Sequence, residues 1–394
     1  MGATTVIIGG GLAGAKAAEA LRDKGYDGTV VLIGAEAHLP YERPPLSKGY
    51  LAGSDDRDSV FVHDREWYDD KNVDLRIDVT ATRIDREAKA VHLSDGTAVD
   101  YDKVVLATGS RPRHFPGDPD VQYLRTLDDS ELLRERLGEG KSLLVVGAGW
   151  IGLEAAAAAR TLGTAVTVVE PEDVPLARVL GAEQGGVIAD LHRRHGVDLR
   201  LGVGVKAIES GAVTTDDGET LRADPILVGI GAEPEVALAR EAGLAVGNGV
   251  DVDARLRTSD PDIVAVGDIA NHDHPIFGRI RIEHWANALN QPAVAVANLL
   301  GGNEAYTRLP YFYTDQYEFG MEYRGHAAGD DELVVRGSVA DLEYLAFWLA
   351  DGVVRAGMNV NIWDQGDDIA ALVQSQRIVD PARLADASIP LADV

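Results

Sequence analysis

The same local pattern occurs twice in this 394-residue chain: a short apolar run, a glycine-rich hexapeptide, an alanine-rich stretch and a second apolar run. The first hexapeptide follows Thr4 to Ile8, the second follows Leu143 to Val146, and they read Gly9-Gly10-Gly11-Leu12-Ala13-Gly14 and Gly147-Ala148-Gly149-Trp150-Ile151-Gly152. Each copy predicts a strand, a tight turn and a helix, with Gly25 and Gly163 as the helix stops. Second strands are expected at Val30 to Ile33 and at Ala165 to Val169.

The first, third and sixth residues of each hexapeptide are the glycines of the motif, and they are expected to have different tasks. In this motif the first makes the tight turn, the second lets the backbone approach a pyrophosphate, and the third lets the helix pack on the strand. The N-terminus of the helix then binds the anion. Glu36 and Glu170 follow about 20 residues later, where a carboxylate accepts hydrogen bonds from ribose hydroxyls. The repetition therefore predicts two dinucleotide sites, one for a flavin and one for a nicotinamide, because hydride exchange is a reason to bind both.

The composition excludes several other classes of function. Acidic residues outnumber basic ones by 64 to 37, and the net charge of −27 repels nucleic acids and anionic membrane surfaces. We find no apolar stretch of signal-peptide or membrane-spanning length and expect a cytoplasmic protein. The absence of cysteine excludes disulfides, thiolate metal sites, internal iron–sulfur clusters and a catalytic cysteine. Two histidine-containing stretches, 192–195 and 272–274, lack a recognised zinc spacing, and no metal is expected.

Three further buried strands that end in a glycine turn are expected, at Val104 to Gly109, Ile226 to Gly231 and Ile263 to Asp268. With them, the chain resembles the glutathione-reductase-like flavoprotein superfamily over nearly its whole length. It is more closely similar to the NADH-dependent ferredoxin or rubredoxin reductases of bacterial oxygenase systems. The resemblance implies an α/β fold with two Rossmann-like domains, an FAD-binding domain interrupted by an NAD-binding domain, and a C-terminal α+β interface domain. The implied boundaries are 1–110 with 241–316 for FAD, 111–240 for NAD and 317–394 for the interface domain.

The resemblance also assigns residues to the two cofactors. Those implied for FAD are Gly9, Gly11, Ala13, Gly14, Glu36, Arg43, Pro44, Lys48, Val79, Thr108, Gly109, Arg125, Asp268 and Trp285. Those implied for NADH are Gly147, Gly149, Gly152, Glu170, Arg178 and Gly231. Core packing or a surface ion pair is the alternative for Val79 and Arg125, and a core tryptophan is the alternative for Trp285.

The most diagnostic stretch is Arg43-Pro44-Pro45-Leu46-Ser47-Lys48, which recurs in oxygenase-coupled reductases. In that family the lysine lies near flavin N5 and pairs with a glutamate in the first turn of the second motif's helix, a position that Glu154 matches. A cation there stabilises the anionic reduced flavin. The alternative is that Lys48 and Glu154 are unrelated surface charges. We expect these two residues to be catalytic.

Charge indicates which nicotinamide cofactor is used. Glu170, Glu172 and Asp173 place carboxylates where a 2′-phosphate would lie, which favours NADH over NADPH. Arg178 matches a position near the adenosine ribose in relatives, but it is equally explained as a counter-charge for this acidic turn.

Without cysteine, the disulfide reductase and peroxidase branches of the superfamily are excluded, and electrons must leave the flavin for a separate carrier. The resemblance implies a ferredoxin or rubredoxin that serves a haem monooxygenase or a Rieske-type oxygenase. Tyr311 and Tyr313 stand where ferredoxin-coupled relatives commonly have tryptophan, which leaves two alternatives open. One is a diaphorase acting on a quinone or monodehydroascorbate, and the other is a redox sensor similar to apoptosis-inducing factor. A monomer and a homodimer are both compatible with the sequence.

An acidic carrier would need a local basic surface on this acidic protein. Four arginines lie close together in the sequence near the expected flavin edge, and we hypothesise that they form such a patch: Arg279, Arg281, Arg308 and Arg324.

Overall fold

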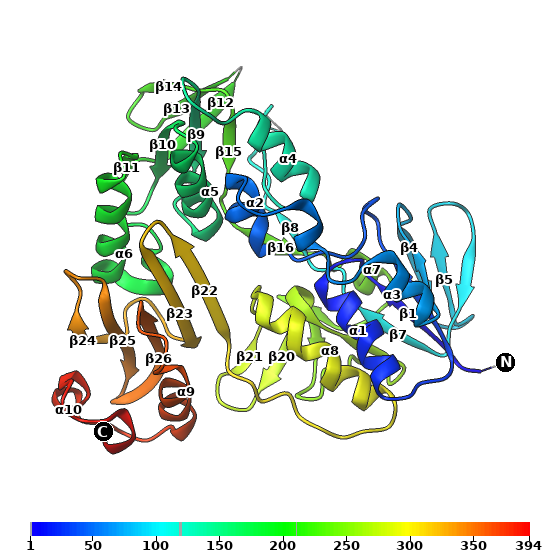
Figure 1. Ribbon diagram of the computed structural model, residues 1–394. Helices are drawn as coiled ribbons and strands as arrows, with labels where there is room; N and C mark the ends of the chain where they lie inside the picture. The colour runs from blue at the N-terminus through cyan, green and yellow to red at the C-terminus, as the bar shows by residue number, and fades with distance from the viewer. Residues whose placement is uncertain (1, 118–119, 210) are drawn as a thin grey trace. The chain divides into compact units, whose positions relative to one another are not determined.

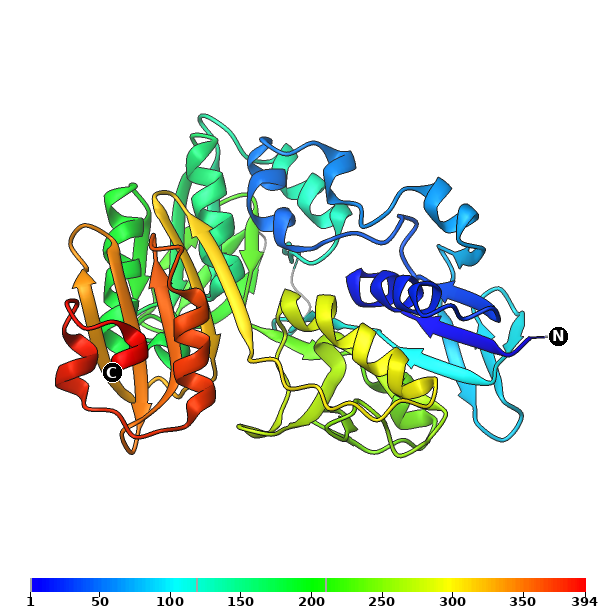
Figure 2. The same cartoon turned by 60° about the horizontal axis from the view of Figure 1, so that its bottom comes forward.

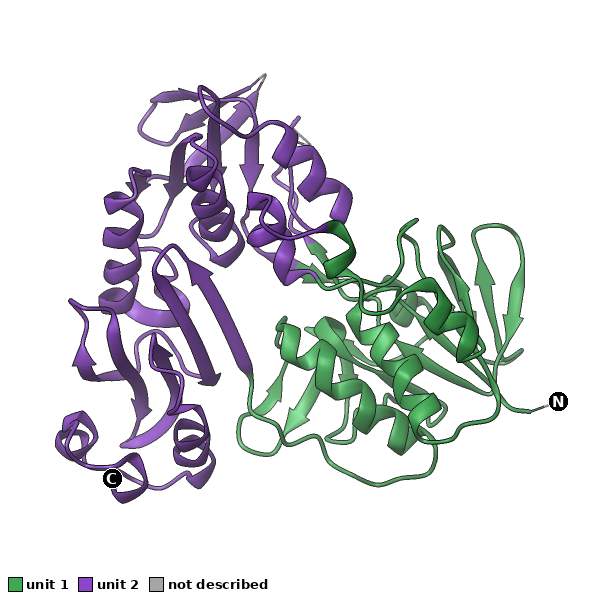
Figure 3. Cartoon of the chain, viewed as in Figure 1, with its two compact units in different colours: residues 1–42, 57–111, 233–310 green, residues 43–56, 112–232, 311–394 purple. Residues whose placement is uncertain are grey.

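The computed structural model describes residues 2–117, 120–209 and 211–394, and its chain forms two compact units (Figure 3). Unit 1 comprises residues 1–42, 57–111 and 233–310, and unit 2 comprises residues 43–56, 112–232 and 311–394. Each unit is therefore assembled from three separate stretches of chain. Two short strands lie at the boundary residues, β8 (Ser110–Pro112) and β16 (Ala232–Pro234). The domain boundaries expected from the resemblance remain a prediction.

Unit 1 is built around a five-stranded parallel sheet with the order β19-β7-β1-β2-β3. The strands are β1 (Thr4–Ile8), β2 (Thr29–Ile33), β3 (Val73–Arg76), β7 (Lys103–Leu106) and β19 (Ile263–Ala265). Their β-branched side chains are buried, as expected for a parallel sheet covered on its faces. Two helices, α1 (Leu12–Asp23) and α8 (Trp285–Leu299), lie side by side against it (Figure 1). The carboxyl end of β1 thus leads directly into the N-terminus of α1.

Two smaller sheets complete unit 1. One is antiparallel, with the order β4 (Ala81–Asp85), β5 (Ala90–Leu93) and β6 (Ala98–Asp100). The other has the order β17 (Val246–Gly247), β18 (Gly249–Val252), β20 (Ala270–His274) and β21 (Gly278–Ile280). The short helices of this unit are η2 (Arg57–Val60), α3 (Arg65–Asp70), α7 (Ala237–Glu241) and η3 (Gly267–Ile269).

The second copy of the repeated pattern forms the parallel sheet of unit 2, in the order β11-β10-β9-β15. Its strands are β9 (Ser142–Val146), β10 (Ala165–Glu170), β11 (Asp198–Leu201) and β15 (Ile226–Val228). The helices are α5 (Trp150–Thr161), α6 (Ala177–Arg194), α4 (Leu127–Glu135), η1 (Pro44–Ser47) and α2 (Gly49–Ala52). A small antiparallel sheet adds β12 (Val205–Glu209), β13 (Ala212–Thr215) and β14 (Thr220–Arg222).

The C-terminal stretch of unit 2 is a five-stranded antiparallel sheet in the order β22-β23-β26-β25-β24. Its elements are β22 (Tyr311–Gln316), β23 (Phe319–Gly325), β24 (Glu332–Ser338), β25 (Glu343–Ala350), β26 (Val353–Val360), α9 (Gly366–Ser375), α10 (Pro381–Ala385) and η4 (Leu391–Asp393). Figure 2 shows α9 and α10 on one face and α5 and α6 on the other. Tyr344 and Trp348 of β25 donate hydrogen bonds to α6, to Gln184 Oε1 at 2.6 Å and to the Leu180 carbonyl at 3.3 Å. One hydrophobic core therefore joins this sheet to the helices of the second repeat.

The sequence-based fold class is confirmed: two parallel-sheet nucleotide-binding folds and a C-terminal antiparallel α+β part. The strand expected at Thr4 to Ile8 is β1, and those expected at Val30 and Leu143 begin one residue earlier. Within the described ranges, the helices include none with the length and apolar character needed to cross a bilayer.

Candidate functional site

The first glycine-rich turn, between β1 and α1, has no room for a side chain at Gly9 and Gly14 but leaves Gly11 open. Gly9 has φ +128°, and a Cβ added there would lie 2.0 Å from the Ala107 carbonyl oxygen. A Cβ on Gly14 would lie 1.9 Å from the Gly9 carbonyl oxygen, so the helix starts in direct backbone contact with the turn. At Gly11 an added Cβ would meet no described atom within 4 Å beyond its neighbours. This open backbone at a helix N-terminus fits a pyrophosphate.

The second glycine-rich turn, between β9 and α5, repeats that geometry. Gly147 has φ +103°, and its added Cβ would lie 2.5 Å from the Gly229 carbonyl oxygen. The Cβ of Gly152 would lie 2.2 Å from the Gly147 carbonyl oxygen, whereas that of Gly149 would have its nearest described contact at 3.8 Å. Each unit therefore carries one cradle of the shape that a dinucleotide needs.

The two expected ribose-binding carboxylates come at or just after the end of the second strand of each repeat. Glu36 follows β2 and accepts a hydrogen bond from the Tyr41 hydroxyl. Glu170 ends β10 and accepts hydrogen bonds from the backbone N–H of Ala148, at 2.6 Å, and of Glu172, at 3.1 Å. The Glu170 carboxylate therefore lies against the second glycine-rich turn itself.

Arg178 pairs with an acidic neighbour. Its side chain is 87% exposed and its guanidinium pairs with Glu172 at 2.8 Å. The acidic turn therefore has its counter-charge within the chain, and a role for Arg178 at the ribose stays a prediction.

Three more residues expected at FAD are fixed by neighbours in unit 1. Thr108 donates from Oγ1 to the Glu235 carbonyl at 2.7 Å, and the Gly109 carbonyl accepts from the Glu235 N–H at 2.9 Å. Asp268 lies in η3, where its carboxylate accepts a hydrogen bond of 2.7 Å from Ser110 Oγ. The turn after β7 and the turn after β19 are thus tied together beside the first cradle.

The remaining cofactor candidates of unit 1 are Ala13, Val79 and Trp285. Ala13 is buried in α1, and Val79 packs partly buried against the core. Trp285 is the first residue of α8, and its Nε1 donates to Glu42 Oε2 at 3.0 Å. Trp285 is therefore partly exposed at a helix N-terminus rather than enclosed in the core.

Unit 2 holds the other candidates. Arg43 donates to the Arg125 carbonyl at 2.5 Å, and Pro44 begins η1. Gly231 has φ +112°, a conformation that favours glycine, and an added Cβ would meet no described atom within 4 Å.

The structure brings Lys48 and Glu154 together, although they lie far apart in the sequence. Lys48 Nζ is 2.8 Å from Glu154 Oε2, and the side chains are 17% and 3% exposed. Glu154 accepts two further hydrogen bonds, from Ser47 Oγ at 2.5 Å and from Thr314 Oγ1 at 2.6 Å. A buried carboxylate needs such partners because its desolvation is costly. Lys48 and Glu154 therefore form a mostly buried ion pair, supported by further hydrogen bonds, and are not two unrelated surface charges.

Sequence reasoning assigned no role to Ser47 or Thr314. Ser47 stands inside the diagnostic hexapeptide, next to Lys48. Thr314 is buried on β22 and shares its face with Gln316, but the strand Tyr-Phe-Tyr-Thr-Asp-Gln has no apolar alternation that would mark it in the sequence.

The aromatic residues of β22 lie near the same ion pair. The Tyr313 ring centre is 5.5 Å from Lys48 Nζ and 6.3 Å from the Tyr311 ring. Tyr311 donates to Glu322 Oε1 at 2.7 Å. Burial raises the pKa of Asp315 on the same strand; the nearby Lys48 opposes that shift, while Glu154 and Glu322 add to it. The site thus combines one ammonium with several carboxyl groups.

Three of the four arginines of the hypothesised basic patch are engaged by acids. Arg279 lies 3.7 Å from Asp251 and Arg324 lies 3.0 Å from Glu322, while Arg281 pairs with Glu283. These ion pairs partly compensate the positive charge of the three side chains, and the basic docking patch stays a prediction. Within the described ranges, no group of three or more histidine, aspartate or glutamate side chains is arranged to hold a metal ion.

Comparisons with known proteins agree with this geometry. Residues 3–292 match the protein family described as "Pyridine nucleotide-disulphide oxidoreductase", and residues 311–394 match "Reductase C-terminal". The chain is 43% identical to the "Anthranilate 1,2-dioxygenase system ferredoxin--NAD(+) reductase component" of Burkholderia cepacia, over 98% of each protein. It is 38% identical to a putidaredoxin reductase of Pseudomonas putida, over 99% of this chain and 96% of that protein. A crystal structure of the covalent putidaredoxin reductase-putidaredoxin complex matches with a TM-score of 0.95 and 37% identity, over 99% of this chain and 97% of that one.

Proposed function

Because the chain belongs to the pyridine nucleotide-disulphide oxidoreductase family, we propose that it is an FAD-dependent NADH:ferredoxin reductase. It would accept a hydride from NADH and pass single electrons to a separate iron–sulfur carrier, a ferredoxin or rubredoxin that serves an oxygenase. The observation that carries the proposal is the presence of two dinucleotide cradles in a chain without cysteine. Such a chain has no thiol of its own to receive the electrons.

Unit 1 would hold FAD, which supplies the ability to take up two electrons and release them one at a time. The open backbone at Gly11 would bind the pyrophosphate, and Glu36 would accept hydrogen bonds from the ribose of the adenosine. Ser110 would hold the Asp268 carboxylate ready for the ribityl hydroxyls.

Unit 2 would hold NADH at the N-terminus of α5. Gly149 would let the backbone approach the pyrophosphate, and Glu170 would accept hydrogen bonds from the ribose hydroxyls. Glu170, Glu172 and Asp173 would repel the 2′-phosphate of NADPH. The pairing of Arg178 with Glu172 supports this preference, since that arginine is already engaged.

Lys48 would keep a positive charge close to the reacting atoms. Its ion pair with the buried Glu154 holds the ammonium in one place, so little reorganisation is needed when negative charge develops nearby. We also propose a cytoplasmic location, where NADH is available.

The test is NADH-driven reduction of cytochrome c by the purified flavin-loaded protein, with and without a purified bacterial ferredoxin. We expect a large increase on addition of ferredoxin that saturates with its concentration, and a much weaker reaction with NADPH. If NADH bleaches the flavin but ferredoxin has no effect, the electron acceptor is of another kind, such as a quinone. Slow reoxidation together with a change in mass would favour the redox-sensor alternative.

A further inference from the structure

Four buried polar side chains form a continuous line through unit 2 and end at the Lys48 ion pair. They are Glu154 on α5, Thr314 and Gln316 on β22, and His192 on α6, with exposed fractions of 3%, 0%, 1% and 0%. Sequence reasoning treated His192 only as a rejected metal ligand. The line therefore joins the C-terminal sheet to two helices of the second repeat.

Each neighbouring pair in the line is within hydrogen-bond distance. His192 Nε2 lies 2.7 Å from Gln316 Oε1, and Gln316 Nε2 lies 3.1 Å from Thr314 Oγ1. Thr314 Oγ1 lies 2.6 Å from Glu154 Oε1, and the other carboxylate oxygen, Oε2, is the one that pairs with Lys48. The two oxygens of Glu154 thus have separate partners.

The chemistry of these groups sets the direction of every hydrogen bond. An amide nitrogen only donates, so Thr314 Oγ1 accepts from Gln316 and must donate its own hydrogen to Glu154. An amide oxygen only accepts, so His192 carries its hydrogen on Nε2. All donors therefore point toward Glu154, which receives them as a carboxylate.

The surroundings of His192 disfavour the opposite direction of the hydrogen bonds in the line. Burial lowers the pKa of His192 to about 4, so the ring is neutral and its Nδ1 bears no hydrogen. Nδ1 is buried and has no hydrogen-bond partner among the described residues. Reversing the line would move the hydrogen to Nδ1 and create a buried N–H without an acceptor, which is unfavourable.

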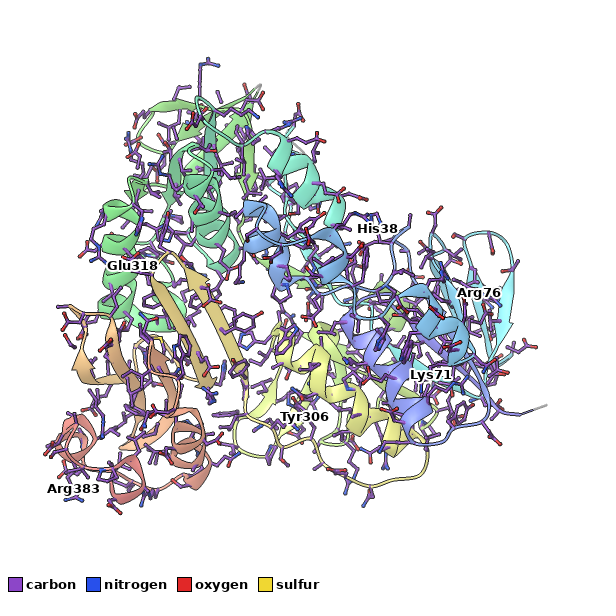
Figure 4. All side chains as sticks on the ribbon, viewed as in Figure 1. His38, Lys71, Arg76, Tyr306, Glu318 and Arg383 are labelled. Carbon is purple, nitrogen blue, oxygen red and sulfur yellow. The ribbon has the colours of Figure 1, made fainter. Side chains whose placement is uncertain are left out.

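A second set of contacts holds the end of β22 against α6. His195 stacks on Tyr317 with ring centres 3.7 Å apart, and its Nε2 lies 2.7 Å from Glu318 Oε2. Figure 4 labels Glu318 at the turn between β22 and β23, beside α6. These contacts lie next to the line but are not part of it, which makes His195 a suitable control.

We propose that His192, Gln316 and Thr314 are positioning residues that hold the Glu154 carboxylate in the orientation that pairs with Lys48. Through them, α6 and the C-terminal sheet determine where the Lys48 ammonium lies. The importance of this for electron transfer rests on the proposed function, whereas the positioning itself can be measured without turnover. Among the described residues, the charged and titratable groups facing the line include Lys48 and Asp315 at one end and His195 and Tyr317 at the other.

The test measures how fast an amine-acylating reagent modifies Lys48 in the folded, flavin-loaded protein, by mass spectrometry of the Lys48 peptide. Lys103, which pairs with Asp262 in unit 1, serves as the internal reference. Thr314→Val keeps the shape but removes the hydroxyl, and Gln316→Met removes both hydrogen bonds of the amide. We expect Lys48 to be modified about tenfold faster in Thr314→Val, because a hydrogen bond to the charged Glu154 is lost. In Gln316→Met, which acts on Glu154 only through Thr314, we expect modification to be about threefold faster. Thr314→Ser retains the hydroxyl and should react as the wild type does.

The contribution of His192 is tested by substituting two histidines in turn, His192 in α6 and His195 at the C-cap of that helix. His192→Phe, although it makes no direct contact with Glu154, should also accelerate modification of Lys48, by about threefold because the effect is indirect. His195→Phe disturbs the same helix end and should leave the Lys48 rate unchanged.

Wild-type rates for Lys48 in correctly folded Thr314→Val and Gln316→Met proteins would overturn the proposal and leave these residues a packing role only. Should Gln316→Met fail to fold, the isosteric Thr314→Val variant still decides. Because the labelling needs neither NADH nor ferredoxin, a protein that fails the ferredoxin test can still pass or fail this one.

Discussion

Gly9 and Gly11 are two residues apart in one turn, and the structure predicts different effects of alanine at the two positions: a loss of stability at Gly9 and a loss of FAD binding at Gly11. Gly9→Ala places a Cβ 2.0 Å from a carbonyl oxygen at φ +128°, so we expect it to destabilise the fold by about 2 to 4 kcal/mol. Gly11→Ala enters open space and should change the free energy of unfolding by less than about 1 kcal/mol. It should nevertheless reduce bound FAD, because the methyl group occupies the place of the pyrophosphate.

Denaturant unfolding of the apoproteins measures the stability difference, and the ratio of flavin to protein absorbance measures cofactor content. A Gly11→Ala protein that folds and retains full flavin would contradict the assignment of this turn to FAD.

Residues such as these could be predicted because their requirement is local. The positive φ of the turn favours glycine at Gly9, and the motif spacing identifies it, whereas the close approach of the Ala107 carbonyl is seen only in the fold. Gln316 and His192 could not be predicted as partners, because they lie 124 residues apart and only the packing of β22 on α6 brings them together. Lys48 and Glu154 are intermediate: the resemblance paired them, but the residues alone did not.

At the scale of elements, a buried histidine with a lowered pKa in each unit makes folding sensitive to acid. Burial lowers the pKa of His192 on α6 and of His272 on β20 from 6.5 to about 4. Well above pH 6.5, both rings are neutral in the folded and in the unfolded chain. Between pH 6.5 and 4 the unfolded chain binds protons that the folded chain does not, so stability falls as the pH falls. The free energy of unfolding lost over this pH range is on the order of 3 kcal/mol for each histidine.

We therefore expect His272→Phe to lose less free energy of unfolding than the wild type between about pH 7 and about pH 4.5, by about 2 kcal/mol. His114→Asn, at an exposed position, serves as the control and should follow the wild-type curve. Parallel curves for all three proteins would show that carboxylates alone cause the acid sensitivity.

Helices and strands could be predicted where a glycine follows the end of an apolar stretch. Gly25 and Gly163 stop the first helix of each repeat, and β10 extends only one residue past its expected end. The small sheets β4–β6 and β12–β14 had no such signal. Many of their residues are exposed, so little hydrophobic alternation marks them in the sequence.

At the scale of the whole molecule, the net charge of −27 acts on any charged carrier at long range. For a ferredoxin that is itself negative, association should be repulsive at low ionic strength. Raising NaCl from about 20 mM to about 150 mM shortens the range of that repulsion, so kcat/KM for ferredoxin should rise several-fold. The rate with a neutral quinone should stay constant. A fall in kcat/KM for ferredoxin with added salt would instead reveal a dominant local attraction at the docking surface.

The three-part composition of unit 2 limits how such proteins can be recombined. Residues 43–56 follow the first repeat, yet they pack with residues 112–232 and 311–394, and Lys48 meets its partner there. A chimera that exchanged only the contiguous stretch 112–232 would separate Lys48 from a co-adapted Glu154, and Glu154 from Thr314. The smallest part that can be exchanged intact is therefore discontinuous, and grafts between relatives should carry all three stretches together.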